Sequence, residues 1–257
     1  MIAESQLEDF ALYGLLKLEG VLSAAAVADM YDRVWRFIEK RDGMLRDDPT
    51  SWIGKKLSTI KGVANGKIFD AIISHEVLKA VHQLTEGRSA SRREGTSRQL
   101  LVTFPNAANW TVPYRAWHYD LQQLPGGSGP PPGVQLFAFL NTVRPGGGGT
   151  VVVTGTHRLL KDLSYSMSPS AMKDHLGRKF DYFHKLFSKD DTNRQHFVDE
   201  PYRIGDVELQ VVEMTGKPGD VMLMDMRLLH TQAPNSLDTP RMMLTERLLV
   251  EQPATAS

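Results

Sequence analysis

The stretch VQLFAFLNTVRPGGGGTVVVT, residues 134–154, decides the fold class. It contains two apolar runs, 134–142 and 150–154, joined by the sequence PGGGG at 145–149. Short apolar runs bounded by Gly and Pro are typical of β-strands. The glycine run lacks the following Lys of a phosphate-binding loop and leads into a strand rather than a helix, so we interpret it as a turn.

Further strands of the same kind surround this stretch. They are predicted near 99–104, 114–121, 207–214, 220–229 and 242–250. The linkers between them are rich in turn residues, as in PGGSGPPPG at 125–133 and KPGD at 217–220. Many short strands favour a sandwich, barrel or jelly roll, and the lack of regular β-α alternation argues against a doubly wound sheet.

Helical periodicity marks the first hundred residues instead. Ser23 is a candidate N-cap for a helix whose apolar residues recur from Val27 to Ile38. A second helix is predicted to begin after Ser74 and to stop near Gly87. The sequence therefore predicts a mainly β protein with N-terminal helices.

The chain is interpreted as one domain, residues 1–257, with three kinds of segment. Residues 1–98 form a helical support, residues 99–157 and 207–250 form the β core, and residues 158–206 form a partly helical lid insertion. Phe180, Phe183 and Phe187 of the insertion are spaced like one helix face. This face either packs against the sheet or contacts a substrate, and periodicity alone leaves both open.

Composition narrows the class of protein. Lys+Arg and Asp+Glu are both 30, so no net positive field favours nucleic acid or an anionic membrane. The chain has no cysteine, which leaves nitrogen and oxygen as the ligands for any metal. The N-terminus lacks the pattern of a secretory signal, and no stretch approaches the apolar length of a membrane span. We expect a cytoplasmic protein with a small-molecule substrate and no nucleic-acid or membrane partner; the oligomeric state stays open.

A histidine and a carboxylate lie two residues apart in WHYD, residues 117–120. On a strand such residues point to the same face, so His118 and Asp120 would lie side by side. Chance supplies such a tripeptide readily, so a third ligand is needed from elsewhere. His230, at the end of the strand predicted at 220–229, is the best candidate. His157 competes for this place, although it more plausibly ends a strand at a turn.

Two histidines and one carboxylate occupy one face of an octahedral metal and leave three positions open. Such a site can hold a chelating 2-oxo acid and dioxygen together. The distal carboxylate of the 2-oxo acid then needs a cation several ångströms away, for which a guanidinium is well suited. Arg241 lies 11 residues after His230 and begins a strand that we expect to neighbour the strand of His230. The alternative is an ordinary surface arginine.

The order of these motifs extends over most of the chain. It comprises WHYD (117–120), GTVVVTGTH (149–157), Gly219-Asp220, His230, Asn235 and Arg241. This order resembles the phytanoyl-CoA dioxygenase family, roughly over residues 10–250. The family comprises oxygenases that depend on Fe(II) and 2-oxoglutarate and are built on a double-stranded β-helix. The resemblance thus implies a cupin-like jelly roll that uses Fe(II), 2-oxoglutarate and dioxygen.

Carried over by position, the resemblance implies that His118, Asp120 and His230 bind iron. It also implies that Arg241 forms a salt bridge with the 2-oxoglutarate carboxylate. Halogenating relatives replace the metal carboxylate by a small residue, so Asp120 disfavours halogenation. The implied reaction is the hydroxylation, or another oxidation, of a substrate with release of succinate and carbon dioxide.

The resemblance implies roles for two further residues, whereas the roles of three histidines stay open. Phe137 falls where the family often has an aromatic wall beside the co-substrate. Gln232 stands two residues after His230, where the family commonly has a small hydroxyl residue, and its amide can hydrogen-bond a carboxylate. The roles of His175, His184 and His196 in the insertion stay open.

The expected substrate is a small organic molecule or a specialised metabolite. Three alternatives remain beside this hypothesis. The chain could be an iron oxygenase that does not use 2-oxoglutarate, or a zinc hydrolase, because zinc also accepts N,N,O ligands. It could also be a non-catalytic metal- or ligand-binding protein on the same fold.

Overall fold

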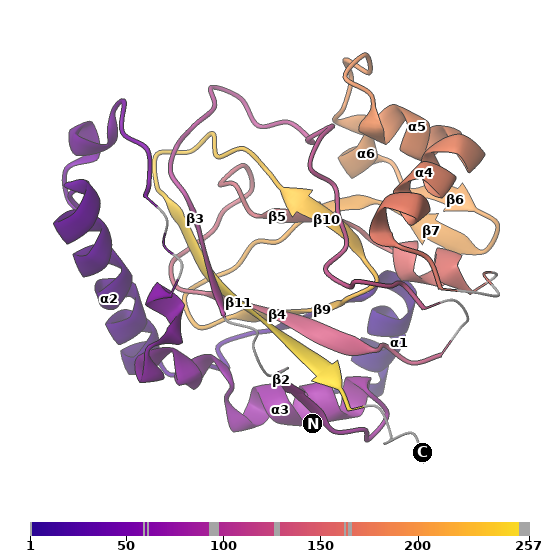
Figure 1. Ribbon diagram of the computed structural model, residues 1–257, viewed down its shortest axis with the longest axis horizontal. Helices are drawn as coiled ribbons and strands as arrows, with labels where there is room; N and C mark the ends of the chain where they lie inside the picture. Colours follow the sequence, from indigo (N-terminus) through magenta and orange to yellow (C-terminus); the bar gives the residue numbers. More distant parts are fainter. Residues whose placement is uncertain are drawn as a thin grey trace.

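The largest element of the computed structural model is an antiparallel sheet (Figure 1). The structure describes residues 2–58, 60, 62–92, 98–125, 129–161, 163 and 166–251. In spatial order the strands are β1 (Leu15–Leu18), β9 (Val221–Asp225), β4 (Gly133–Phe139), β11 (Arg241–Val250) and β2 (Ala90–Arg92), and β3 (Gln99–Thr103) also pairs with β11. We call it the large sheet.

A smaller antiparallel sheet faces the large one. Its strands, in order, are β10 (Leu229–Gln232), β5 (Thr150–Val153) and β8 (Val211–Glu213). His118 extends this small sheet through a bridge to His230, in which each residue's N–H donates to the carbonyl of the other. A separate hairpin consists of β6 (Tyr202–Ile204) and β7 (Val207–Leu209).

The alternating directions of the side chains along β11 show how the layers are arranged. On β11, Met242 and Leu244 point to a core that the large sheet shares with the N-terminal helices, whereas Met243 points the other way. Met243 packs with Phe137 of β4 and Val152 of β5 in a core between the two sheets. Two sheets that face each other in this way form the expected jelly roll, and the predicted fold class is confirmed.

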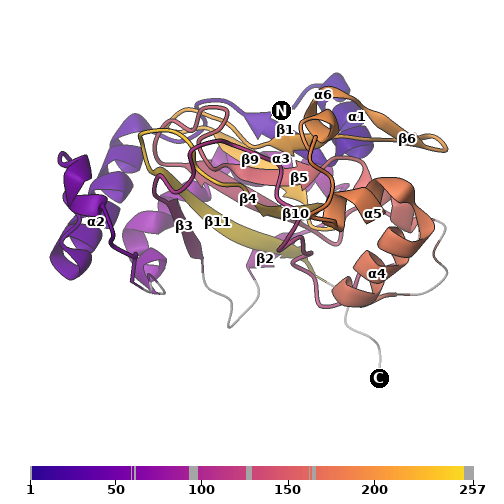
Figure 2. The same cartoon turned by 90° about the horizontal axis from the view of Figure 1, so that it is seen from above.

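Helices cover the outer face of the large sheet (Figures 1 and 2). They are α1 (Glu4–Tyr13), α2 (Ala24–Asp42), α3 (His75–Leu84) and the short 3₁₀ helices Pro49–Trp52, Val63–Asn65 and Lys67–Ile72. The hydroxyls of Ser23 and Ser74 accept the N–H groups of Ala26 and Val77. The predicted N-cap at Ser23 and the predicted helix start after Ser74 are therefore confirmed. None of the helices in the described ranges has the length and apolar composition needed to cross a membrane.

Residues 158–206 carry a helical layer that lies against the small sheet. It contains α4 (Pro169–Lys179), α5 (Asp181–Phe187) and α6 (His196–Asp199), which Figure 2 shows gathered at one end of the molecule beyond β10; a 3₁₀ helix, Thr156–Leu160, leads into the layer. Phe183 and Phe197 are fully buried in the same core as Val151 and Val153 of β5. Of the two alternatives for the helix face that bears Phe183, packing against the small sheet is therefore the one observed.

Three details of the predicted strands are wrong. The strand predicted at 207–214 is interrupted at Gln210 and forms two strands, β7 in the separate hairpin and β8 in the small sheet. Residues 114–121 do not form a strand, and only His118 makes a bridge. The backbone of Ala116 has a positive φ of 62°, which a regular strand does not accommodate. The strand predicted at 220–229 ends at Asp225, whose carboxylate accepts the N–H of Arg227 in a turn. His230 consequently lies on the next strand, β10.

The strands that bear Arg241 and His230 were expected to be neighbours, but they are not paired with each other. β11 pairs with β2, β3 and β4, whereas β10 pairs with β5. Arg241 and His230 thus belong to opposite sheets. They approach each other across the space between the sheets rather than along one sheet.

Candidate functional site

His118, Asp120 and His230 lie together; His230 is buried, Asp120 is half-buried, and the side chain of His118 is 51% exposed. Each offers one possible ligand atom, and these three atoms lie within 4.8 Å of one another. His230 Nε2 is 3.5 Å from Asp120 Oδ2, and His118 Nε2 is 3.9 Å from Asp120 Oδ1. Among the described residues, no other group of three His, Asp, Glu or Cys side chains meets this criterion. The residues predicted from sequence are therefore brought to one place.

The two histidines are oriented in the same way. The Nδ1 atom of His118 is 2.8 Å from the carbonyl oxygen of Ala116, and Nδ1 of His230 is 3.0 Å from that of Leu228. Because a carbonyl oxygen only accepts, each Nδ1 carries the proton and each Nε2 keeps a free lone pair. Both lone pairs are therefore available to a metal beside Asp120.

The local electrostatics keep these groups in the forms that bind a metal. Burial and the neighbouring His230 lower the pKa of His118, which favours the neutral imidazole. Burial alone would raise the pKa of Asp120, but His230, Arg247 and Gln135 together hold it well below its ordinary value. Asp120 is thus an anion and His118 is neutral near pH 7.

A cavity of about 130 Å³ joins the three residues to Arg241. Phe137 of β4, 1% exposed, forms part of its wall. Gln232 also lines the cavity, but its Nε2 donates to Thr103 Oγ1 at 2.7 Å. The remaining lining residues are Gln99, Leu101, Gln135, Thr150, Thr231 and Thr245.

Arg241 carries a buried positive charge at the far end of this cavity. Its side chain is 2% exposed, and its Nη2 donates to Thr103 Oγ1 at 2.7 Å. The contact from Nη1 to Thr150 Oγ1 is longer, 3.4 Å, and Nε has no hydrogen-bond partner. No described acidic side chain forms an ion pair with Arg241, and burial lowers its pKa to about 10. Besides the hydroxyls, Nη1 contacts Met243 Sδ at 4.0 Å. A buried guanidinium with no ion pair is a site for an anion.

The glycine-rich turn supports this end of the cavity. The N–H groups of Gly146 and Gly149 donate to the two carboxylate oxygens of Glu213, at 2.7 and 2.8 Å. Burial raises the pKa of Glu213, while these N–H groups oppose that shift. A Cβ at Gly149 would collide with the backbone of Met214, so only glycine fits there. The turn therefore binds a side chain of the protein itself, and it fixes the start of the strand that bears Thr150.

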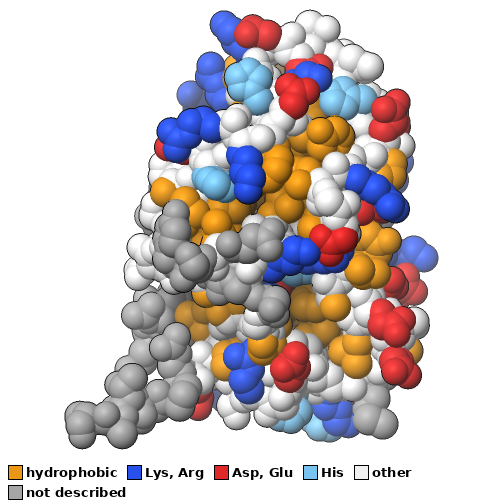
Figure 3. Space-filling model, turned by 90° about the vertical axis from the view of Figure 1, so that its right-hand side faces the viewer, with side chains coloured by type: hydrophobic (Ala, Val, Ile, Leu, Met, Phe, Trp, Pro, Cys, Tyr) orange, Lys and Arg blue, Asp and Glu red, His pale blue; other side chains and the backbone are white. Residues whose placement is uncertain are grey.

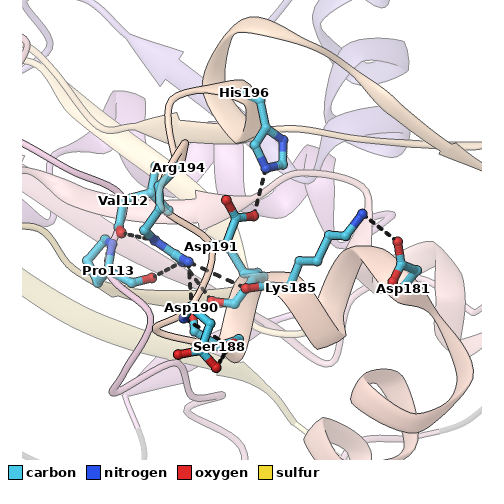
Figure 4. A network of polar contacts seen from close by, with 10 residues as sticks. Val112, Pro113, Asp181, Lys185, Ser188, Asp190, Asp191, Arg194 and His196 are labelled. Carbon is cyan, nitrogen blue, oxygen red and sulfur yellow. Dashed lines mark hydrogen bonds and ion pairs between the residues drawn. The ribbon is translucent and has the colours of Figure 1, made fainter.

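A buried arginine ties the helical layer to the segment before the metal cluster (Figure 4). Arg194, 7% exposed, donates to the carbonyl oxygens of Val112 and Pro113 on one side, at 2.6 and 2.9 Å. On the other side it donates to those of Leu186 and Ser188, at 2.7 and 2.9 Å. The helical layer therefore holds the chain a few residues ahead of His118.

The remaining histidines lie away from the cluster. His157, the competing third ligand, has its Nε2 3.0 Å from the carbonyl oxygen of Ala11 and borders a separate cavity of about 440 Å³. His196 pairs with Asp191 at 2.9 Å, and the exposed His184 lines a shallow surface pocket. His175 is half-buried on α4.

Several residues of the site were missed by sequence reasoning. Thr103 and Thr150 hold Arg241, whereas Gln135 and Arg247 approach Asp120. Each lies on a predicted strand at an inward position, so alternation could have nominated them. No sequence signal distinguishes them from other inward residues.

The sequence matches the family described as phytanoyl-CoA dioxygenase over residues 10–243. The chain belongs to this family. Phytanoyl-CoA dioxygenase family members use Fe(II), 2-oxoglutarate and dioxygen, so this chain is an oxygenase of that class. None of the curated proteins matches the chain.

Solved structures of similar fold agree with the family. AviO1 from Streptomyces viridochromogenes Tue57 is 18% identical, with 98% of this chain and 96% of AviO1 aligned at a TM-score of 0.60. HygX from Streptomyces hygroscopicus, solved with nickel and 2-oxoglutarate, is 14% identical over 97% of this chain and 88% of HygX, with a TM-score of 0.56. The epimerase SnoN, in complex with Fe3+, alpha ketoglutarate and nogalamycin RO, is 17% identical over 99% of this chain and 91% of SnoN, with a TM-score of 0.57. At these identities the likeness to the three solved structures shows the fold alone.

Proposed function

We propose that this oxygenase oxidises a small organic molecule, most simply by hydroxylation, at an iron held by His118, Asp120 and His230. Arg241 binds the distal carboxylate of 2-oxoglutarate. When bound, Fe(II) and 2-oxoglutarate supply the oxidising power, and the co-substrate leaves as succinate and carbon dioxide. The reaction takes place in the cytoplasm, as the sequence predicts.

The buried charge of Arg241 is the observation that carries this assignment. A fully buried guanidinium without a carboxylate partner is costly, because desolvation is not offset by an ion pair. The cavity that Arg241 shares with the three candidate ligands is lined mainly by polar side chains. A short dicarboxylate with one end at the iron and the other at Arg241 satisfies both the metal and the unpaired Nε–H group.

The residues of the chain have separate tasks in this proposal. His118 and His230 present Nε2, while their Nδ1–H groups stay bonded to backbone carbonyls and fix the ring orientation. Phe137 excludes water from one wall beside the co-substrate. Gln232 acts through Thr103, because its amide donates to the same hydroxyl that receives Arg241.

A small molecule, such as a specialised metabolite, is the substrate class that we propose. SnoN, of similar fold, was solved with nogalamycin RO, which is a small organic ligand. The face of the molecule that bears the helical layer mixes acidic, basic and apolar side chains (Figure 3).

Turnover of 2-oxoglutarate tests the proposal. The purified protein with Fe(II) and dioxygen should form succinate slowly without substrate and faster with a suitable metabolite. His118→Ala should abolish succinate formation and Arg241→Met should greatly raise the 2-oxoglutarate concentration required. Metal binding without any consumption of 2-oxoglutarate would instead favour an oxygenase of another type, a zinc hydrolase or a non-catalytic binding protein.

A further inference from the structure

Arg247 lies on the inner face of β11, beside the candidate metal ligands. It follows Arg241 and Thr245 at even spacing on the strand, and it is opposite Gln135 of β4. Its Nη2 is 2.9 Å from Asp120 Oδ1, with 29% of the Arg247 side chain and 12% of the Asp120 side chain exposed. In the described part of the chain, this carboxylate is its one polar partner.

The two oxygens of Asp120 consequently have different surroundings. Oδ1 is in contact with the guanidinium of Arg247 and is 3.9 Å from His118 Nε2. Oδ2 is 3.5 Å from His230 Nε2, whereas the ion pair with Arg247 is formed by Oδ1. A guanidinium keeps its proton at all relevant pH values and cannot bind a metal. It therefore competes with a metal for Oδ1 and leaves Oδ2 free.

We propose that Arg247 is a positioning residue that holds Oδ1 of Asp120, so that this carboxylate binds iron through Oδ2 alone. This inference rests on the proposed function. A ligand set of two histidines and a one-oxygen carboxylate leaves three positions, two for 2-oxoglutarate and one for dioxygen. If Asp120 bound through both oxygens, the position for dioxygen would be lost. Arg247 thus protects the vacant position without touching it.

Nitric oxide is a probe of this position that does not depend on turnover. Added anaerobically to the Fe(II) protein with 2-oxoglutarate and no substrate, it occupies a free iron position and gives a characteristic electron paramagnetic resonance signal. Arg247→Met removes the guanidinium at nearly constant volume. We expect Arg247→Met to bind Fe(II) at least as tightly as the wild type, because a positive charge is removed, but to bind nitric oxide about 10-fold more weakly.

Two further variants complete the experiment. Arg247→Lys keeps a positive charge and N–H donors but loses the planar guanidinium, so its nitric oxide affinity should lie between those of Arg247→Met and the wild type. Arg92→Gln is the matched control, since Arg92 pairs with Glu246 at 3.4 Å on the outer side of the same strand. Its Fe(II) and nitric oxide affinities should equal those of the wild type. Thermal unfolding of each apo-protein establishes that the variants are folded.

The outcomes are distinguishable. If wild-type protein binds no Fe(II) or no 2-oxoglutarate, the proposed function fails before Arg247 is tested. If the wild type binds both and folded Arg247→Met has unchanged nitric oxide affinity, the positioning role is overturned. A change confined to the KM of the substrate would also overturn it, because Arg247 would then be a substrate anchor. Loss of Fe(II) binding in folded Arg247→Met would do the same, since Arg247 would then be required to form the metal site itself.

Discussion

Thr103 Oγ1 lies 2.7 Å from Nη2 of Arg241, and the two residues come from adjacent strands of the large sheet. The hydroxyl directs the guanidinium into the cavity between the sheets. We expect Thr103→Val to weaken 2-oxoglutarate binding by about 10-fold, since a hydrogen bond to a charged group contributes about 1.5–3 kcal/mol. Anaerobic calorimetry of the Fe(II) protein measures this. Fe(II) affinity should not change, and a parallel loss of Fe(II) affinity would contradict the separation of the two subsites.

Arg241 should lower the stability of the apo-protein, although it contributes to the binding of 2-oxoglutarate. Replacing this buried and unpaired charge by an apolar side chain of similar volume, Arg241→Met, should raise the free energy of unfolding by about 1–4 kcal/mol. Denaturant unfolding of the apo-protein gives this value. A destabilisation of similar size would mean that the hydroxyls of Thr103 and Thr150 already compensate the charge.

Arg194 should be important for stability because it bonds five carbonyl oxygens of two separate segments (Figure 4). Arg194→Met leaves these buried acceptors without a donor, and we expect the free energy of unfolding to fall by about 3 kcal/mol or more. Lys185→Gln is a suitable control. It removes only the solvent-exposed pair with Asp181, which contributes little to stability. Equal effects of the two variants would refute the special role of Arg194.

The buried Glu213 gives a pH dependence with a definite sign. Its pKa in the folded state is raised above 4.5, so the folded protein takes up this proton before the unfolded chain does. The contribution of Glu213 to stability therefore rises as the pH falls through the raised pKa towards 4.5, and it declines as the pH rises. The difference in unfolding free energy between wild type and Glu213→Gln, measured across this window, isolates the effect. A difference that is constant with pH would show that the pKa is not raised.

The fold class and the metal cluster could be predicted because they depend on local signals. Ser23 and Ser74 are N-caps that precede regular apolar repeats, and both helices begin where these residues predict. His230 was nominated by its place at the end of the strand predicted at 220–229, and the family resemblance agreed, although that strand ends earlier, at Asp225. The lid role and the one-domain interpretation stay predictions.

Other features depend on contacts that the sequence does not display. Ala116 adopts a left-handed backbone conformation, which is uncommon for alanine and cannot be predicted from the residue type. This conformation prevents a regular strand from reaching His118. The carboxylate of Asp225 forms a turn inside an apolar run that resembles one long strand. The ion pair between Arg247 and Asp120 could not be predicted, because it forms only when the folded jelly roll brings β11 beside Asp120.

Anaerobic titration of the Fe(II) protein with 2-oxoglutarate tests the central claim most directly. Chelation of Fe(II) by the 2-oxo acid produces a visible charge-transfer absorption. The wild type should develop this band, His118→Ala should not, and Arg241→Met should need at least about 10-fold more 2-oxoglutarate. If the wild type shows no band, or if Arg241→Met titrates like the wild type, the assignment of this cavity to iron and 2-oxoglutarate is wrong.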